Sequence, residues 1–115
     1  MNDSTECVFC KIIAGVIPSP HIAVNDEAIA INDISPVAPT HYLIVPRTHK
    51  ENAVALHASN PTGLSSLFDL VHEITAREKI DDYRLVFNTG AGAGQSVFHA
   101  HLHLIAGRAF SWPPG

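Results

Sequence analysis

The sequence lacks the features that several large classes of protein require. Only two of its 115 residues are cysteine, whereas a secreted domain of this size usually carries more. The formal net charge is -4, so the chain has no positive surface for duplex nucleic acid or for an anionic membrane. No apolar run approaches the roughly 18 residues that span a bilayer, and residues 1–6 are polar rather than typical of a secretion signal. These absences predict a soluble cytoplasmic protein.

Core-forming residues, in contrast, are plentiful. Hydrophobic side chains make up 46% of the sequence and charged side chains 16%. A chain of this length buries roughly two thirds of its unfolded surface, which supports a core without disulfides. We therefore expect one domain over residues 1–115. The composition is also unusually rich in histidine, with eight residues.

The pattern of apolar residues predicts five strands and two helices. The spacing after Asn60 and Pro61 predicts one long helix that ends near Lys79. A short helix is expected over residues 7–14, before Gly15. The predicted strands are 21–25, 28–32, 41–45, 83–88 and 97–105, and the polar residues 47–52 are expected to form a loop. Short connections between most strands indicate an α+β fold with a mainly antiparallel five-stranded sheet.

Three histidines alternate with apolar residues in the last predicted strand. His99, His101 and His103 stand two residues apart, so the pleat of a strand places their imidazoles on one face, about 6.5 to 7 Å apart. Packing alone would not favour a row of titratable rings, because each ring needs hydrogen-bond partners when it is buried. Two interpretations stay open: a metal site, or a histidine nucleophile with supporting groups.

A glycine-rich segment, NTGAGAGQS, precedes these histidines over residues 88–96. Its glycines can adopt the backbone conformations that aim N–H groups at phosphate oxygens. The spacing matches neither the Rossmann nor the Walker pattern, because no lysine follows and the next predicted element is a strand. The segment alone is also compatible with a flexible hairpin. Beside three imidazoles, it indicates chemistry at phosphorus.

The order of this loop and the run HAHLHLIAG closely resembles the histidine triad (HIT) family. The upstream segment AINDISPVAPTHYLIVPRTH resembles the nucleotide-binding region of that family, and GRAFSWPPG is similar to the C-terminus of its Hint branch. The resemblance covers nearly the whole chain. It implies a HIT-like fold, a purine nucleoside phosphoramidase or related nucleotidyl hydrolase, and a homodimer in which Trp112 of the tail 107–115 reaches the active site of the partner.

The resemblance also implies catalytic roles. His101 is the expected nucleophile, which attacks the α-phosphorus of a purine nucleotide conjugate and carries the nucleotidyl group until water releases AMP or GMP. His103 is expected to contact the phosphoryl oxygens. His99 and His41 are expected to support this centre, and an ordinary core histidine is the alternative for His41. Ser96 is expected to act on the phosphate and the leaving group.

A bound nucleotide would contact further residues. By the same resemblance, Asp33 accepts hydrogen bonds from both ribose hydroxyls, which its two oxygens allow. Ile31 and Ile34 are expected to line the base pocket, and related proteins often have an aromatic residue at the position of Ile31. The residues expected to hold the phosphate and the leaving group are Asn88, Gly94, Gln95 and Ser96, together with His101 and His103.

Cys7 and Cys10 form a C-x-x-C pair, which is half of a zinc site. A redox role is less favoured, because the pair lacks the preceding strand of a thioredoxin-like unit. Some proteins that the chain resembles bind zinc with such a pair, the histidine of a P-x-x-H segment and the first triad histidine. Here these ligands are Cys7, Cys10, His49 and His99. The resemblance thus implies a structural zinc ion that links residues 1–15 to the last strand, and no organic cofactor.

Two other functions stay open. One is the hydrolysis of dinucleotide polyphosphates, as in another branch of the same superfamily, although the ending SWPPG disfavours it. The other is a non-catalytic protein that binds a nucleotide or zinc and acts through partners. The remaining histidines, His21, His57 and His72, belong to no motif and are expected at the surface.

Overall fold

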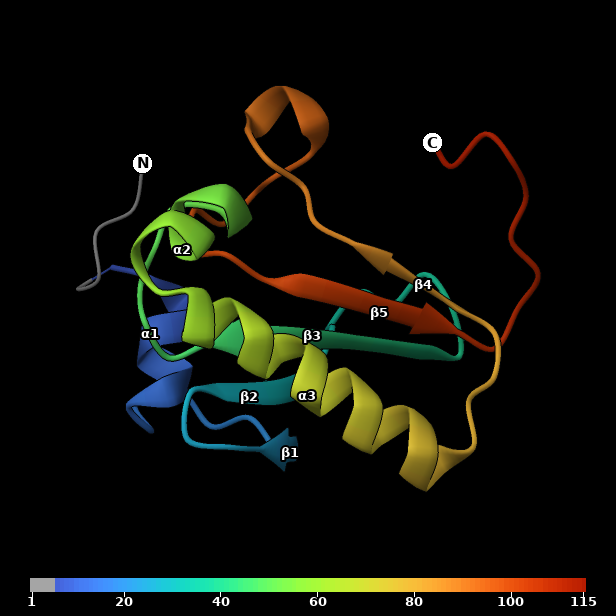
Figure 1. Ribbon diagram of the computed structural model, residues 1–115, viewed down its shortest axis with the longest axis horizontal. Coiled ribbons are helices and arrows are strands. Elements are labelled where there is room, and N and C mark those ends of the chain that lie inside the picture. The colour runs from blue at the N-terminus through green and yellow to red at the C-terminus, as the bar shows by residue number, and fades with distance from the viewer. Residues whose placement is uncertain (1–5) are drawn as a thin grey trace.

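The computed structural model describes residues 6–115, in which five strands form one antiparallel sheet (Figure 1). The strands are β1 (His21–Val24), β2 (Ala28–Asn32), β3 (Thr40–Pro46), β4 (Tyr83–Val86) and β5 (Leu102–Ala106). Their order across the sheet is β1-β2-β3-β5-β4, so β5 lies between β3 and β4. The predicted α+β fold is confirmed. Of the predicted polar stretch 1–6, all but Glu6 lies outside the described residues.

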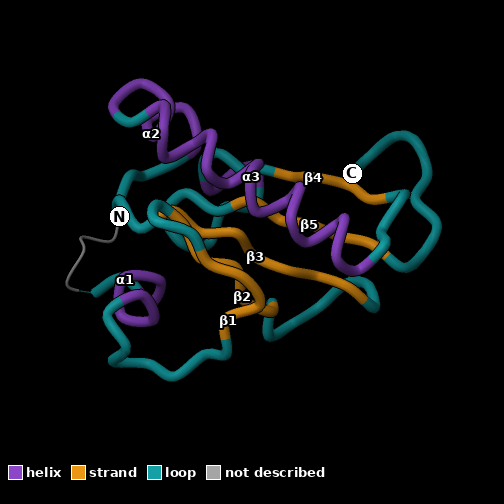
Figure 2. The backbone as a smooth tube through the Cα atoms, turned by 60° about the horizontal axis from the view of Figure 1, so that its bottom comes forward, coloured by secondary structure: helices purple, strands orange, loops and turns teal. Residues whose placement is uncertain are grey.

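Three α-helices accompany the sheet: α1 (Val8–Ile13), α2 (Ala53–Ser59) and α3 (Pro61–Glu78). A short 3₁₀ helix, η1 (Ala91–Ala93), lies in the glycine-rich loop. The long helix α3 lies across one face of the sheet, and α1 lies on the opposite side (Figure 2). The side chain of Asn60 caps α3 by accepting the N–H of Gly63 at 3.1 Å, and the helix stops at Lys79, where φ is +55°.

Helix α2 is the one α-helix of the described residues that the sequence does not predict, since the sequence favours two helices. The side chain of Asn52 begins α2 by accepting the N–H of Ala55 at 2.9 Å. The helix has 7 residues, and Leu56 alone among them is buried. A helix with one buried side chain produces no apolar periodicity, so the pattern of the sequence cannot reveal it.

The sheet separates two apolar layers, because successive residues of a strand face opposite sides. Ala28 and Ala30 of β2 belong to the layer beneath α3, where small side chains allow the helix to lie close to the sheet. Ile29 and Ile31 belong to the layer that packs against α1. All four are buried, so β2 is covered on both faces. The candidate functional residues gather around the second layer.

Strand β5 is shorter than the predicted strand 97–105. Its pairing with β3 begins where Leu102 lies opposite Ile44. Before that point, the N–H of Ala100 donates to the carbonyl oxygen of Lys50 at 2.8 Å and not to a neighbouring strand. His103 is therefore the one triad histidine within β5, and His99 and His101 precede the strand. The ring centroids of His101 and His103 lie 5.1 Å apart, closer than a regular strand would place them.

Two further expectations concern the exposed histidines and the absence of a membrane-spanning helix. His21, His57 and His72 are exposed, as predicted. Within residues 6–115, no helix has both the length and the apolar character needed to cross a membrane. The cytoplasmic location stays a prediction.

Candidate active site

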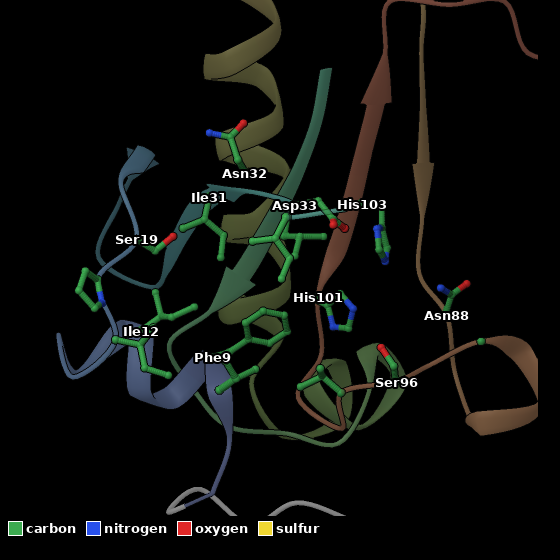
Figure 3. Close-up of a pocket in the computed structure, with 17 residues that line it drawn as sticks. Phe9, Ile12, Ser19, Ile31, Asn32, Asp33, Asn88, Ser96, His101 and His103 are labelled. Atoms are coloured by element: carbon green, nitrogen blue, oxygen red, sulfur yellow. The ribbon is translucent and has the colours of Figure 1, made fainter. Parts of the chain in front are cut away.

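A pocket of about 400 Å³ lies beside α1, the end of β2, the middle of β3 and the beginning of β5 (Figure 3). One end is apolar, with Phe9, Ile12 and Leu43 among its lining residues. The other end is polar and holds the imidazoles of His101 and His103. An apolar wall with a few convergent polar groups is typical of a site for a small molecule.

Nearly all the predicted substrate-binding residues line this pocket. They are Ile31, Asp33, Ile34, Asn88, Gly94, Ser96, His101 and His103. The exception is Gln95, which is buried and turns its side chain into the glycine-rich loop. Its amide nitrogen donates to the carbonyl oxygens of Glu51 and Val97, and its amide oxygen accepts the N–H of Gly90. All polar groups of this side chain are therefore occupied in bracing the loop.

Several backbone amides of the glycine-rich loop are also occupied. The N–H groups of Ala93, Gly94 and Gln95 donate to carbonyl oxygens within the loop, at 3.0 to 3.1 Å. These groups are therefore turned toward the loop itself, and they do not form the phosphate-binding amides that its glycine content suggests. The side chains of Asn88 and Ser96 are the polar groups with which this segment lines the pocket.

Sequence reasoning missed most of the apolar end of the pocket. The lining residues that it did not predict are Val8, Phe9, Ile12, Ile17, Pro18, Ser19, Asn32, Leu43 and Val97. The spacing of apolar residues in 7–14 indicates a helix with an apolar side, but no local signal says what that side covers. Phe9 is 5% exposed and lies edge-on against the rings of His99 and His101. Helix α1 is thus a wall of the site.

One hydrogen bond fixes the ring of His101. Its Nδ1 lies 2.8 Å from the carbonyl oxygen of His99. Because a carbonyl oxygen can only accept, Nδ1 carries the proton and Nε2 keeps its lone pair. Burial lowers the pKa of His101, and the bond to His99 and the nearby carboxylate of Asp33 offset part of that decrease. The pocket therefore contains a neutral imidazole with an unprotonated nitrogen.

A second chain of hydrogen bonds sets the proton on His103. The N–H of Val37 donates to Nδ1 of His41 at 3.2 Å, so His41 carries its own proton on Nε2. That proton is donated to Nδ1 of His103 at 2.9 Å. His103 must then be protonated on Nε2, a buried atom that has no hydrogen-bond partner among the described residues. Burial, together with His101 and His41, lowers the pKa of His103 to about 4, so this donor is neutral at pH 7.

Asp33, His41 and His103 lie near enough to one another to be considered as metal ligands. The carboxylate of Asp33 is 3.4 Å from Nε2 of His41. That nitrogen, however, is protonated, because the N–H of Val37 occupies the lone pair of Nδ1. A protonated nitrogen cannot bind a cation. The protonated nitrogen of His41 therefore favours a hydrogen-bonded cluster over a metal site. His41 lies on β3, the strand next to β5, which is the location that the sequence predicts.

The four predicted zinc ligands meet at the beginning of α1. The Sγ atoms of Cys7 and Cys10 lie 3.4 and 3.5 Å from Nδ1 of His99. Nδ1 of His49 lies 3.3 Å from Sγ of Cys10 and 3.0 Å from Nδ1 of His99. Bonds of about 2.0 to 2.3 Å to a tetrahedral zinc ion place its ligand atoms roughly 3.3 to 3.8 Å apart. The spacing of the four atoms approaches that arrangement.

His99 has the tautomer that a metal requires. Its Nε2 donates to the carbonyl oxygen of Pro46 at 2.7 Å, so Nδ1 directs a lone pair at the two sulfur atoms. Burial lowers the pKa of His99 to about 4, which keeps the ring neutral. Burial and the neighbouring Cys7 raise the pKa of the Cys10 thiol to about 11, so its ionisation at neutral pH needs a cation. This set of donors suits zinc.

Comparisons with known proteins agree with these features. A family model described as "Scavenger mRNA decapping enzyme C-term binding" matches residues 6–111. The chain is 38% identical over 113 residues to an uncharacterized HIT-like protein of Synechococcus elongatus, covering 97% of this chain and 99% of that protein. It is 37% identical over 117 residues to the 14 kDa zinc-binding protein of Zea mays, covering 98% of this chain and 91% of that protein.

A solved structure is also similar. The HIT family hydrolase from Legionella pneumophila Philadelphia 1 has a TM-score of 0.88 and 38% sequence identity, and the match covers 96% of this chain and 100% of that one. The similarity therefore extends over the sheet, the helices and the histidine-containing segment. The chain belongs to the histidine triad (HIT) family.

Proposed function

We propose that the protein hydrolyses nucleoside 5′-phosphoramidates, or related nucleotidyl conjugates, at the α-phosphorus and releases a purine nucleoside monophosphate. The observation that carries this proposal is the ring of His101, whose Nδ1 is held by the carbonyl of His99 while Nε2 keeps its lone pair. A neutral, oriented imidazole of this kind is a suitable nucleophile. The likeness to a HIT family hydrolase supports the same class of reaction.

The pocket offers a complementary group for each part of a nucleotide. Its apolar end, with Phe9 and Ile31, suits the base, and such walls discriminate weakly between adenine and guanine. Asp33 suits the ribose, because its carboxylate can accept from two hydroxyls. The N–H of Ser35 donates to Oδ1 of Asp33 at 2.7 Å and holds this carboxylate in place. The phosphate would then lie between His101 and His103.

In the first step, Nε2 of His101 forms a bond to phosphorus while the bond from phosphorus to the leaving nitrogen breaks. The Nε2–H group of His103 donates to a non-bridging oxygen, where negative charge develops. The leaving amine departs with one added proton. Ser96 is exposed at this end of the pocket, so its hydroxyl can relay that proton from solvent. Asn88 is available to bind the leaving group.

In the second step, water attacks the nucleotidyl group on His101. A bond from oxygen to phosphorus forms, and the bond from phosphorus to Nε2 breaks. The proton of the water passes to solvent, the monophosphate leaves, and His101 regains its neutral form. Two in-line displacements replace one difficult hydrolysis, which is the advantage of a covalent intermediate.

The test is mass spectrometry of the protein mixed with an adenosine phosphoramidate, combined with an assay of AMP release. We expect a nucleotidyl adduct on His101, and we expect His101→Asn to abolish both the adduct and the release of AMP. His57→Asn is the matched control, because His57 is exposed on α2 and should leave turnover unchanged. Full activity of His101→Asn would overturn the mechanism, and AMP binding without any adduct would favour a non-catalytic binding protein.

Specificity for the leaving group needs its own comparison. A dinucleotide polyphosphate and a phosphoramidate present the same α-phosphorus to His101, and they differ in what departs. We expect the larger kcat/KM for the phosphoramidate. Faster cleavage of the dinucleotide would assign the protein to the polyphosphate-hydrolysing branch and retain the role of His101.

We also propose that Cys7, Cys10, His49 and His99 bind one structural zinc ion. The similar zinc-binding protein of Zea mays supports this assignment. Zinc would join α1 to the chain that precedes β5 and would contribute to folding. Elemental analysis should find about one equivalent of zinc per chain, and Cys10→Ser should lower it. If protein that was prepared without chelators contains no zinc, the proposed zinc site is wrong.

We further propose that the protein is a homodimer. Within the described chain, β4 pairs with β5 and has no strand on its other side. An open strand edge favours pairing with another chain. Trp112 in the tail is 84% exposed in the single chain, which fits the expectation that it reaches a partner. Light scattering during size-exclusion chromatography should give twice the mass of the chain, and a monomer at all concentrations would refute the proposal.

A further inference from the structure

The chain after β5 lies against the loop between β2 and β3 at two points. Gly107 has a φ of +95°, and a Cβ atom at this position would lie 3.0 Å from Cβ of Pro39, so the approach leaves no room for a side chain. Directly after it, Nε of Arg108 donates to the carbonyl oxygen of Val37 at 2.8 Å. Residues 107 and 108 therefore brace the loop that begins at Asp33.

Val37 connects Arg108 to the imidazoles of the site. Its carbonyl oxygen accepts from Arg108, and its N–H donates to Nδ1 of His41 at 3.2 Å. A bond to the carbonyl restricts rotation of this residue and so keeps its N–H directed at the ring. A neutral imidazole has one donor and one acceptor, so this contact, together with the carboxylate of Asp33 at 3.4 Å from Nε2, favours a proton on Nε2 of His41.

We propose that Arg108 is a positioning residue that acts through Val37 to keep His41 and His103 in the tautomers required at the pocket. With the N–H of Val37 in place, His41 donates from Nε2 to His103, and His103 keeps its proton on Nε2. When the N–H of Val37 turns away, His41 can hold its proton on Nδ1. His103 must then donate from Nδ1, and the Nε2–H group that lies at the pocket is lost.

The consequence for catalysis rests on the proposed function, in which Nε2–H of His103 donates to a phosphoryl oxygen. The tautomers themselves do not depend on that function. They follow from the donors and acceptors at Val37, His41 and His103. A direct measurement of the tautomers therefore tests the positioning role separately from the reaction.

Arg84 of β4 provides a matched control. The guanidinium groups of Arg84 and Arg108 both lie over the ring of Phe110, at 4.9 and 4.5 Å from its centroid. Arg84 donates to the carbonyl oxygen of Ser111, at 3.0 Å, whereas Arg108 reaches Val37. Replacing Arg84 removes the same charge and a similar ring contact and leaves the bond to Val37 intact.

The experiment is ¹⁵N NMR of the full chain labelled in histidine, with the resonances of His41 assigned through His41→Gln. We expect wild-type His41 to be protonated on Nε2. In Arg108→Ala a substantial Nδ1-protonated population should appear, and in Arg84→Ala the wild-type pattern should persist. Arg108→Lys should lie between them, because an ammonium group can still donate to the carbonyl of Val37 but without the fixed geometry of a guanidinium.

Turnover of the phosphoramidate gives the second readout. We expect kcat of Arg108→Ala to fall about tenfold with KM changed by no more than about twofold, because the base and ribose contacts remain. Arg84→Ala should keep kcat within about twofold of wild type. A general loss of folded protein would instead lower the active fraction of both variants and leave the tautomer of the folded remainder unchanged.

The outcomes separate the two claims. An unchanged His41 tautomer in Arg108→Ala would overturn the positioning role. So would an equal change in Arg84→Ala, which would assign the effect to the packing of Phe110. A changed tautomer with an unchanged kcat would leave the link from Arg108 to His41 intact and would overturn the role of these tautomers in catalysis. If wild type and variants all fail to turn over while Arg108→Ala still switches the tautomer, the link from Arg108 to His41 stands and the proposed function fails.

Discussion

The ring of Phe9 lies edge-on against the ring of His101, with centroids 5.0 Å apart and an interplanar angle of 61°. The same ring meets His99 at 5.8 Å. Phe9 stands on α1 between Cys7 and Cys10, two of the proposed zinc ligands. Helix α1 has 6 residues, too few to be stable in isolation, so its position depends on tertiary contacts and, by our proposal, on the zinc ion. The proposed zinc site and the pocket therefore share helix α1.

Removal of the metal is expected to weaken nucleotide binding. Without the bonds to Cys7 and Cys10, α1 loses a tether, and the apolar end of the pocket loosens. We expect the Kd for AMP to rise about tenfold after chelation. Calorimetry measures the affinity, and hydrogen exchange over residues 8–13 should become faster. Unchanged affinity and exchange in metal-free protein would show that packing alone holds α1, and zinc restored after chelation is the control.

Truncation of Phe9 is expected to reduce stability. The side chain is 5% exposed, and Phe9→Ala removes contacts with two imidazoles and the neighbouring core, at a cost of about 3 kcal/mol. Phe9→Leu should cost only about 1 kcal/mol, because it conserves most of the volume. Val16→Ala is the control, since Val16 is 70% exposed and should change the free energy of unfolding by less than about 0.5 kcal/mol. Urea unfolding of zinc-loaded protein provides the measurement.

The apolar wall also marks what the sequence could and could not predict. The three triad histidines and the C-x-x-C pair are recognisable because each has a chemical character that packing alone does not require, whereas Asp33 is identified only through the resemblance to the family. The apolar residues Phe9 and Leu43 resemble ordinary core residues in a sequence. Only the tertiary placement of α1 against β2 and β3 makes them part of a pocket.

Local sequence likewise predicted the long helix but misjudged elements whose limits depend on neighbours. The cap at Asn60 and a long apolar repeat define α3 from within its own sequence. The beginning of β5 depends instead on a contact outside the sheet: β3 continues to Pro46, but its pairing with β5 stops at Ile44 and Leu102, and the N–H of Ala100 donates to Lys50. In the same way, the sequence predicts that Gln95 binds the phosphate, but in the fold its side-chain amide bonds to the backbone of Gly90 and Glu51.

The low pKa of His103 predicts a loss of stability in mild acid. Burial, with the neighbouring imidazoles, lowers its pKa from 6.5 to about 4 in the folded chain. Between these values the unfolded chain binds a proton that the folded chain does not, so the free energy of unfolding falls as the pH is lowered from about 6.5 toward 4. His103→Asn should flatten this dependence. Thermal unfolding across that range checks it, and parallel curves for variant and wild type would contradict the assignment.

A pair of glycine substitutions isolates the contact between the chain after β5 and the loop above the triad. Gly15 and Gly107 both have positive φ, of 79° and 95°, so an alanine at either position is strained by about 1 kcal/mol. At Gly15 no atom lies within 4 Å of the added Cβ, whereas at Gly107 the Cβ of Pro39 lies at 3.0 Å. Gly107→Ala should therefore cost about 1 to 3 kcal/mol more than Gly15→Ala in the free energy of unfolding. Equal losses of the free energy of unfolding in urea would mean that the loop from Asp33 to Pro39 moves aside at no cost when Gly107 gains a side chain. A loop that moves so easily could not keep the N–H of Val37 directed at His41.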